Sequence, residues 1–251
     1  MNIENYGGNK VKQFQLGNAG KEILGLGPYE YFIYETVENE EVLFDRLNSF
    51  TVFLFDKQDH TTVRVAESNE ELNKGDLVQV EGQSVKIMSK GGVVKFLVAG
   101  TFDSHPDIKG VSVIRHKDIY KVIKPWGHEL WLNGNHPCYA LKQIFIKAGT
   151  KTSLQYHNFK QETNVLFEGT ALLHYKLNPD VKNDLVISND ITTVQIEPIS
   201  SVDILPSTLH RLEAISDITL YETSTPHLND VVRVSDDSNR PDGRIEKEHL
   251  S

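Results

Sequence analysis

The sequence predicts an all-β protein made of two β-barrel or β-sandwich units in tandem. Short segments rich in aromatic and β-branched residues recur along the whole chain, separated by turn formers, as in sandwiches and barrels. Only residues 68–73 suggest a helical turn, with Ser68 as its candidate N-cap. Residues 72–101 and 198–225 share one pattern of strand, turn, strand, polar turn and strand, which favours a duplicated unit. The alternative is one continuous β domain whose strands are alike.

The first unit is predicted to cover residues 1–118. Its expected strands lie at residues 29–37, 50–55, 61–65, 77–80, 85–88 and 93–98. Turn formers such as Gly82-Gln83 and Gly91-Gly92 separate them. We place the boundary between the two units in the polar segment 104–119.

The second unit is predicted to cover residues 119–251. Its expected strands lie at residues 129–132, 140–146, 153–157, 164–167, 170–177, 193–196, 201–205 and 219–223. Residues 235–251 are polar and charged, and we expect a surface tail or one short terminal helix there.

Composition limits the classes of function. The 251 residues carry 26 Lys and Arg against 35 Asp and Glu, a formal net charge of -9, which argues against a nucleic-acid binder. The single cysteine, Cys138, excludes an intramolecular disulfide and a cysteine-rich zinc site, and it fits a reducing, cytoplasmic compartment. We see neither a secretory signal nor an apolar run long enough for a membrane span, so no membrane partner is expected.

The most informative segment is residues 149–169. If residues 153–157 form a strand, Ser153, Gln155 and His157 share one face, because side chains alternate along a strand. After a turn, Glu162 begins a return strand and can face the same interior. His210 enters a later strand after the turn at Pro206. A barrel could therefore bring Gln155, His157, Glu162 and His210 together.

These four side chains form a plausible shell for a divalent metal. Two imidazoles, one carboxylate and one amide oxygen leave one or two coordination positions open for water or substrate. We expect zinc first, with manganese, iron or nickel as alternatives.

The same segment resembles the first motif of the cupin family, G-x5-H-x-H-x(3,4)-E-x6-G. Gly149, His157, Glu162 and Gly169 match it, and Gln155 stands where the first histidine is expected. His210 resembles the histidine of the second cupin motif, although its P-S-T-L-H turn is shorter by one residue and lacks the glycine. The resemblance implies tandem cupin barrels of the jelly-roll, or double-stranded β-helix, type.

Further motifs resemble the type II phosphomannose isomerase branch of that family. Its S-L-Q-x-H is present at residues 153–157. Its R-P-W-G is resembled by K-P-W-G at 124–127, its H-R-x-E by residues 210–213, and its D-D-I-V-R-x-x-D-x-Y-G-R ending by residues 230–240. The Gly-rich nucleotidyltransferase loop that many such enzymes carry has no counterpart here. The resemblance implies a metal-free N-terminal barrel, a metal-bearing C-terminal barrel, and isomerisation of mannose 6-phosphate to fructose 6-phosphate through an enediol(ate).

For this chemistry Arg233, Lys142 and Glu222 are the candidate catalytic residues. Ser153, Tyr175 and Trp126 are candidates for substrate binding. We interpret Arg211, His136, His174 and His227 as structural and Lys160 as a solvated turn charge. Two alternatives stay open: another metal-cupin enzyme, such as an oxygenase or lyase, and a non-catalytic sugar-binding module. We expect a homodimer, because exposed sheet edges of barrels often pair.

Overall fold

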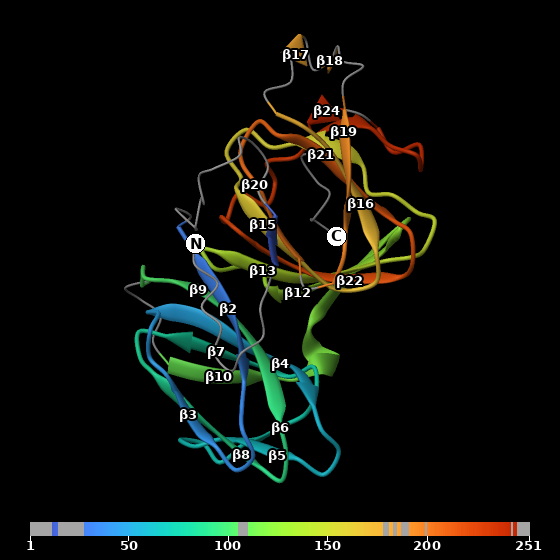
Figure 1. Cartoon of the computed structure of the whole chain (residues 1–251). Coiled ribbons are helices and arrows are strands. Elements are labelled where there is room, and N and C mark those ends of the chain that lie inside the picture. The colour runs from blue at the N-terminus through green and yellow to red at the C-terminus, as the bar shows by residue number, and fades with distance from the viewer. Residues whose placement is uncertain are drawn as a thin grey trace.

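The protein is described here by a computed structural model that covers residues 12–14, 28–104, 110–177, 181–182, 185–186, 191–198, 200–241 and 243–244. Apart from the short 3-10 helix η1 (His116–Asp118), the regular elements of these residues are strands. The predicted all-β fold with two barrels in tandem is confirmed, and Figure 1 shows the C-terminal barrel above the N-terminal one. Within the described residues, no helix has the length and apolar character needed to cross a membrane.

The N-terminal barrel consists of a five-stranded sheet, ordered β10-β7-β4-β9-β2, facing a four-stranded sheet, ordered β3-β8-β5-β6. Its interior is filled by apolar side chains, among them Phe50, Val52 and Leu54 from alternate positions of β4. Its strands are β2 (Glu30–Glu35), β3 (Glu41–Phe44), β4 (Ser49–Lys57), β5 (Thr62–Val65), β6 (Glu71–Leu72), β7 (Leu77–Glu81), β8 (Val85–Lys90), β9 (Val94–Thr101) and β10 (Gly110–Ile114).

The C-terminal barrel pairs a seven-stranded sheet, ordered β1-β20-β15-β22-β13-β12-β11, with a six-stranded sheet, ordered β19-β16-β21-β14-β23-β24. The small β17-β18 ribbon lies beside it. The strand bounds are β1 (Lys12–Phe14), β11 (Tyr120–Lys124), β12 (Gly127–Asn133), β13 (Ala140–Ile146), β14 (Leu154–Tyr156), β15 (Glu162–Glu168), β16 (Ala171–Lys176), β17 (Val181–Lys182), β18 (Leu185–Val186), β19 (Thr192–Ile196), β20 (Ser200–Ile204), β21 (Leu209–Ala214), β22 (Ile218–Ser224), β23 (Val232–Ser235) and β24 (Gly243–Arg244).

The two barrels repeat one strand order. In the larger sheets, β7-β4-β9-β2 corresponds to β20-β15-β22-β13, and in the smaller sheets β3-β8-β5-β6 corresponds to β14-β21-β16-β19. The predicted duplicated unit is therefore present in the topology. Strand β1 comes first in the chain, yet it belongs to the C-terminal barrel, where it pairs in parallel with β20.

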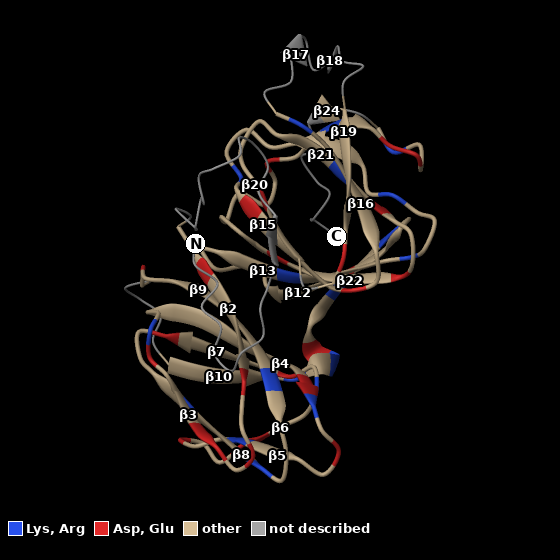
Figure 2. Cartoon of the chain, viewed as in Figure 1, with Lys and Arg blue, Asp and Glu red and all other residues tan. Residues whose placement is uncertain are grey.

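An apolar interface joins the barrels. Residues on the outer faces of both larger sheets pack into one buried cluster, which includes Tyr31, Phe53 and Leu97 from one barrel and Leu141 and Tyr221 from the other. Strands of these sheets are thus buried on both faces, which explains their nearly continuous apolar runs. Acidic and basic positions are interspersed over both barrels (Figure 2).

One local prediction is wrong. Residues 68–73 form no helical turn: Glu71 and Leu72 form strand β6, which pairs with β5. Here tertiary pairing overrides a weak local preference. Within the segment 104–119, where we place the boundary between the units, strand β10 pairs with β7 and completes the N-terminal sheet.

Candidate metal centre

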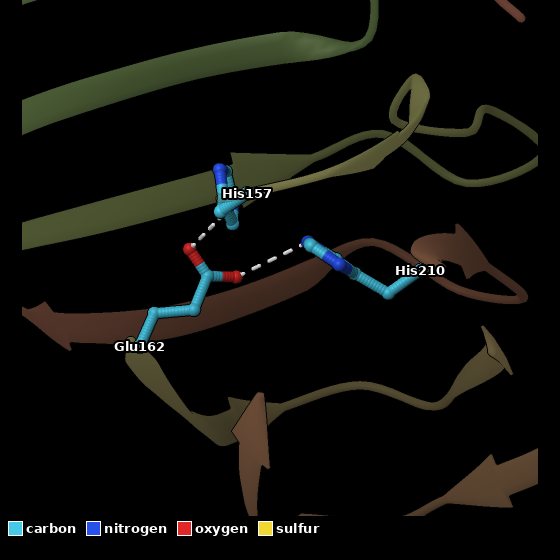
Figure 3. Close-up of side chains that lie close together, drawn as sticks. All are labelled: His157, Glu162 and His210. Atoms are coloured by element: carbon cyan, nitrogen blue, oxygen red, sulfur yellow. Dashed lines mark ion pairs between the residues drawn. The ribbon is translucent and has the colours of Figure 1, made fainter. Parts of the chain in front are cut away.

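Three side chains meet inside the C-terminal barrel. His157 directly follows β14, Glu162 opens β15 and His210 lies on β21. The Nε2 atoms of His157 and His210 each lie 3.3 Å from a different carboxylate oxygen of Glu162. Figure 3 shows the two imidazoles approaching Glu162 from two sides. One ligand atom from each residue lies within 4.8 Å of the others, and all three residues are buried.

The imidazoles are held with their Nε2 lone pairs toward the carboxylate. His157 Nδ1 bonds the carbonyl oxygen of Asp230, and His210 Nδ1 bonds that of Thr208 at 2.9 Å. Because a carbonyl only accepts, each Nδ1 carries a proton, and in the neutral imidazole Nε2 then carries the lone pair. Both Nε2 atoms are buried, and neither has a hydrogen-bond partner among the described residues. Two lone pairs and a carboxylate facing one another in a buried space fit a divalent cation.

The electrostatics match that donor set. Burial lowers the pKa of His157, and the Lys160 ammonium adds to the effect despite the opposing Glu162, so the imidazole is neutral. Burial alone would raise the pKa of Glu162, but the Lys160 ammonium, which donates to its carboxylate, holds that pKa well below its ordinary value. Neutral imidazoles and an ionised carboxylate are the ligand forms that a divalent metal requires.

Gln155 lies beside this triad. Its backbone pairs with His210 across β14 and β21, and its side chain lines the same cavity as the three buried residues. The Ser153 hydroxyl donates to Gln155 Oε1 at 2.8 Å, which fixes the amide and leaves a second lone pair on that oxygen. The structure therefore brings all four sequence-predicted ligands to one cavity, and the role of Gln155 as a ligand stays a prediction.

A cavity of about 80 Å³ opens next to the triad. Its base is apolar, with Trp126, Ile144 and Leu220. Its upper wall is a row of buried charged residues on neighbouring strands of the larger sheet, where Lys142 pairs with Glu222 across β13 and β22. The charged residues lining the cavity apart from the triad are Lys124, Glu129, Lys142, Lys160, Glu222 and Arg240.

The interpretation of Lys160 as a solvated turn charge is wrong. Lys160 is buried, and its Nζ donates to Glu162 Oε2 at 2.5 Å and to Glu222 Oε1 at 2.7 Å. Burial alone would lower its pKa, but the two carboxylates raise the pKa well above its ordinary value. No local signal marks it, because Lys160 lies in the turn before β15, outside the alternation of side chains along a strand.

The remaining predicted residues fall in two groups. Lys142, Glu222, Ser153 and Trp126 line the cavity. Arg233 and Tyr175 are not among the described residues that line it.

Arg233 is buried behind the cavity, where Nη1 donates to the Pro241 carbonyl at 2.8 Å. Sequence reasoning missed Arg240, which lines the cavity and bonds Asp236 Oδ2 at 2.6 Å. Arg240 lies outside the strands, so the alternation of side chains along a strand could not predict that it lines the cavity. Tyr175 pairs with His210 across β16 and β21 and packs partly buried against the core.

Comparison with solved structures shows which known proteins share this fold. The chain superposes on Lactobacillus farciminis oxalate decarboxylase with a TM-score of 0.60 at 10% identity, covering 82% of this chain and 79% of that one. Bacillus subtilis oxalate decarboxylase, which has Mn(II) centres, gives 0.60 at 8%, covering 83% and 72%. Vicilin from hazelnut, Corylus avellana, gives 0.60 at 9%, covering 86% and 80%. At these identities the likeness shows the fold alone, a tandem pair of β-barrels.

The C-terminal barrel can be placed further. Residues 112–222 match the family model described as "Mannose-6-phosphate isomerase C-terminal". This span contains the four candidate ligands together with Lys142, Lys160 and Glu222. No curated protein sequence matches the chain.

Proposed function

We propose that the chain is a metal-dependent sugar-phosphate isomerase of the mannose-6-phosphate/fructose-6-phosphate type. The observation that carries the proposal is the buried His157, Glu162 and His210 triad, with both Nε2 lone pairs aimed at the carboxylate. The match of residues 112–222 to a mannose-6-phosphate isomerase domain supports the substrate class.

Gln155, His157, Glu162 and His210 would hold the metal. Zinc is the first candidate because imidazole suits it, and manganese suits the oxygen donors. When bound, a divalent cation supplies Lewis-acid stabilisation of negative charge on the sugar's carbonyl and hydroxyl oxygens. The carbon-bound proton must be moved by the protein's own side chains.

Lys142 is suited to binding an anionic or oxygen-rich substrate. It is buried, and within the described part of the chain its ammonium makes no hydrogen bond: the carboxylate oxygens of Glu129 and Glu222 lie 3.7 and 3.8 Å from Nζ. A buried ammonium without hydrogen bonds is costly, so its donors are available to a ligand in the cavity. Ser153 and Trp126 line the same space and would contact the sugar.

Glu222 is the best-placed base for the proton shift. Its carboxylate lines the cavity and is fixed by the Lys160 hydrogen bond at 2.7 Å. In the proposed step it takes the proton from the carbon next to the carbonyl and returns it to the neighbouring carbon. Lys142 is the alternative acid–base group. Arg240, rather than Arg233, faces the cavity and would bind the phosphate, while Arg233 holds Pro241 in the segment behind it.

The test loads metal-free protein with zinc, manganese, iron or nickel and supplies mannose 6-phosphate. We expect fructose 6-phosphate and, in D2O, deuterium at the carbon that exchanges its proton. His157→Ala should abolish metal binding and turnover, and Glu222→Gln should keep the metal but lose exchange. His128→Ala, on the outer face of β12, is the matched control. Metal-loaded protein that exchanges no deuterium with any hexose or pentose phosphate would refute the proposal.

A second candidate is a metal-cupin lyase acting on a small carboxylic acid, favoured by the cavity of about 80 Å³, which is small for a hexose phosphate. For the isomerase, we expect Leu228, Val231 and Arg240, which form one wall, to shift outward when the sugar binds. Formation of formate from oxalate by the metal-loaded protein, without deuterium exchange on sugars, would select the lyase. Tight sugar binding without turnover would select a non-catalytic module.

A further inference from the structure

The turn between β14 and β15 carries two residues of the cavity. His157 begins it and Lys160 lies near its end, and neither lies within a strand. The backbone carbonyl of His157 accepts from Ser207 at 2.7 Å. The positions of the imidazole and of the Lys160 side chain therefore depend on what else holds this turn.

One residue, Asp230, contacts the turn at four points. Its carboxylate Oδ2 accepts from the backbone N–H groups of Phe159 and Lys160, the latter at 2.9 Å. Its Oδ1 accepts from Asn158 Nδ2 at 3.1 Å. Its backbone carbonyl accepts from His157 Nδ1. Asp230 lies about seventy residues further along the chain, just before β23, so these contacts bind two distant segments together.

The four contacts have a functional consequence. The carboxylate holds the turn in place, and this keeps the Asp230 carbonyl in line with His157 Nδ1. That bond fixes the proton on Nδ1 and directs the Nε2 lone pair at Glu162. The same carboxylate anchors the backbone of Lys160, whose ammonium reaches Glu162 and Glu222. We propose that Asp230 is a positioning residue for the metal centre, setting both the ligand His157 and the cavity lysine.

This inference rests on the metal site of the proposed function, but it does not depend on the reaction. If Asp230 only stabilised the fold, replacing it would lower the stability of the protein by the same amount with and without metal. A positioning residue, in contrast, should change metal affinity more than it changes the stability of the metal-free protein. Asp217 supplies the matched control, since it is an exposed aspartate of the same barrel that accepts from the Ala148 N–H at 2.8 Å and lies outside the cavity lining.

The experiment titrates metal-free native protein, Asp230→Asn and Asp217→Asn with Co2+, following its visible absorption, and records thermal unfolding of each without metal. Asp230→Asn leaves one accepting oxygen for three N–H donors and removes the charge, so we expect its affinity for Co2+ to fall about 10- to 100-fold. Asp217→Asn should bind like the native chain. A loss for Asp230→Asn no larger than that of the control overturns the proposal, whereas a native chain that binds no Co2+ overturns the metal site itself.

If Asp230→Asn does not fold, nitrogen NMR of the native metal-free protein decides. A slowly exchanging proton on His157 Nδ1 is the expected result. A proton on Nε2 would show that the Asp230 carbonyl does not set the imidazole and would overturn the proposal.

Discussion

Replacing Lys160 with methionine should strongly destabilise the metal-free protein. The ammonium lies between Glu162 and Glu222 at 2.5 and 2.7 Å, and all three side chains are buried. At an effective dielectric constant of about 20, each contact contributes roughly 6 kcal/mol of attraction, offset by the several kcal/mol that desolvating each ion costs. Methionine has similar length but no charge, so it leaves two carboxylates without their bridging cation.

Breaking a buried ion pair by removing one partner costs about 3–5 kcal/mol, and we expect this loss for Lys160→Met. The assay is urea unfolding at pH 7 in the presence of a chelator. Lys121→Met, at an exposed position of β11, is the control and should change the unfolding free energy by less than about 0.5 kcal/mol. Adding Glu222→Gln to Lys160→Met should recover part of the loss, because one of the two uncompensated charges is removed. A loss below about 1 kcal/mol for Lys160→Met would refute the buried charge bridge.

Three further predictions concern other parts of the molecule. Gly169→Ala should lower the unfolding free energy by about 1–3 kcal/mol in urea titrations, because φ is +80° and the new Cβ would lie 2.1 Å from the Asp217 carbonyl oxygen. Burial alone would raise the pKa of Asp76, but hydrogen bonds donated by backbone N–H groups and by Arg115 hold that pKa below its ordinary value. The ionised Asp76 therefore contributes about 1–3 kcal/mol to the free energy of unfolding above pH ~4, and this contribution is lost as the pH falls through the folded-state pKa. Asp76→Asn should lower the free energy of unfolding at pH 7 and should match the native chain in acid. Edge strand β11 exposes Ile123 at 73%, and we expect light scattering to give twice the 28.4 kDa of one chain; a monomeric mass would reject the dimer.

Features that depend on local spacing were predictable. The alternation of side chains puts Gln155 and His157 on one face whatever the rest of the chain does, and Glu162 follows after one turn. The entry of His210 into a strand was visible from the turn at Pro206. The structure brings these residues to one cavity because β14 and β21 are neighbours, which two-barrel topology dictates.

Features that depend on distant partners were not predictable. Lys160 looks like a turn charge until Glu222, sixty-two residues later, is placed beside it. Arg233 lies on β23, whereas Arg240 lies in the irregular segment after it, and the path of that segment brings Arg240 to the cavity. The two-residue strand β6 exists because β5 pairs with it, and no local pattern marks it.

The two barrels share a strand order but not an interior, and the difference locates the chemistry. Strand β4 of the N-terminal barrel corresponds to β15 of the C-terminal barrel. The residues that face inward on these strands are Phe50, Val52 and Leu54 in β4, against Glu162, Asn164 and Leu166 in β15. Buried charge lowers stability compared with apolar packing, so a fold that is stable with an apolar interior keeps a charged layer only where function needs it.

The apolar barrel in turn supports the charged one. The Tyr29 hydroxyl of the N-terminal barrel bonds Thr163 Oγ1 at 3.0 Å, on the residue next to Glu162. The Tyr31 hydroxyl forms a hydrogen bond with Ser201 Oγ, on β20, at 2.6 Å. Both hydroxyls lie in the buried interface between the barrels, where an unsatisfied polar group would cost about 1–3 kcal/mol. The back of β15 is therefore fixed by polar bonds inside an apolar interface, and we infer that the N-terminal barrel holds rigid the strand that presents the Glu162 carboxylate.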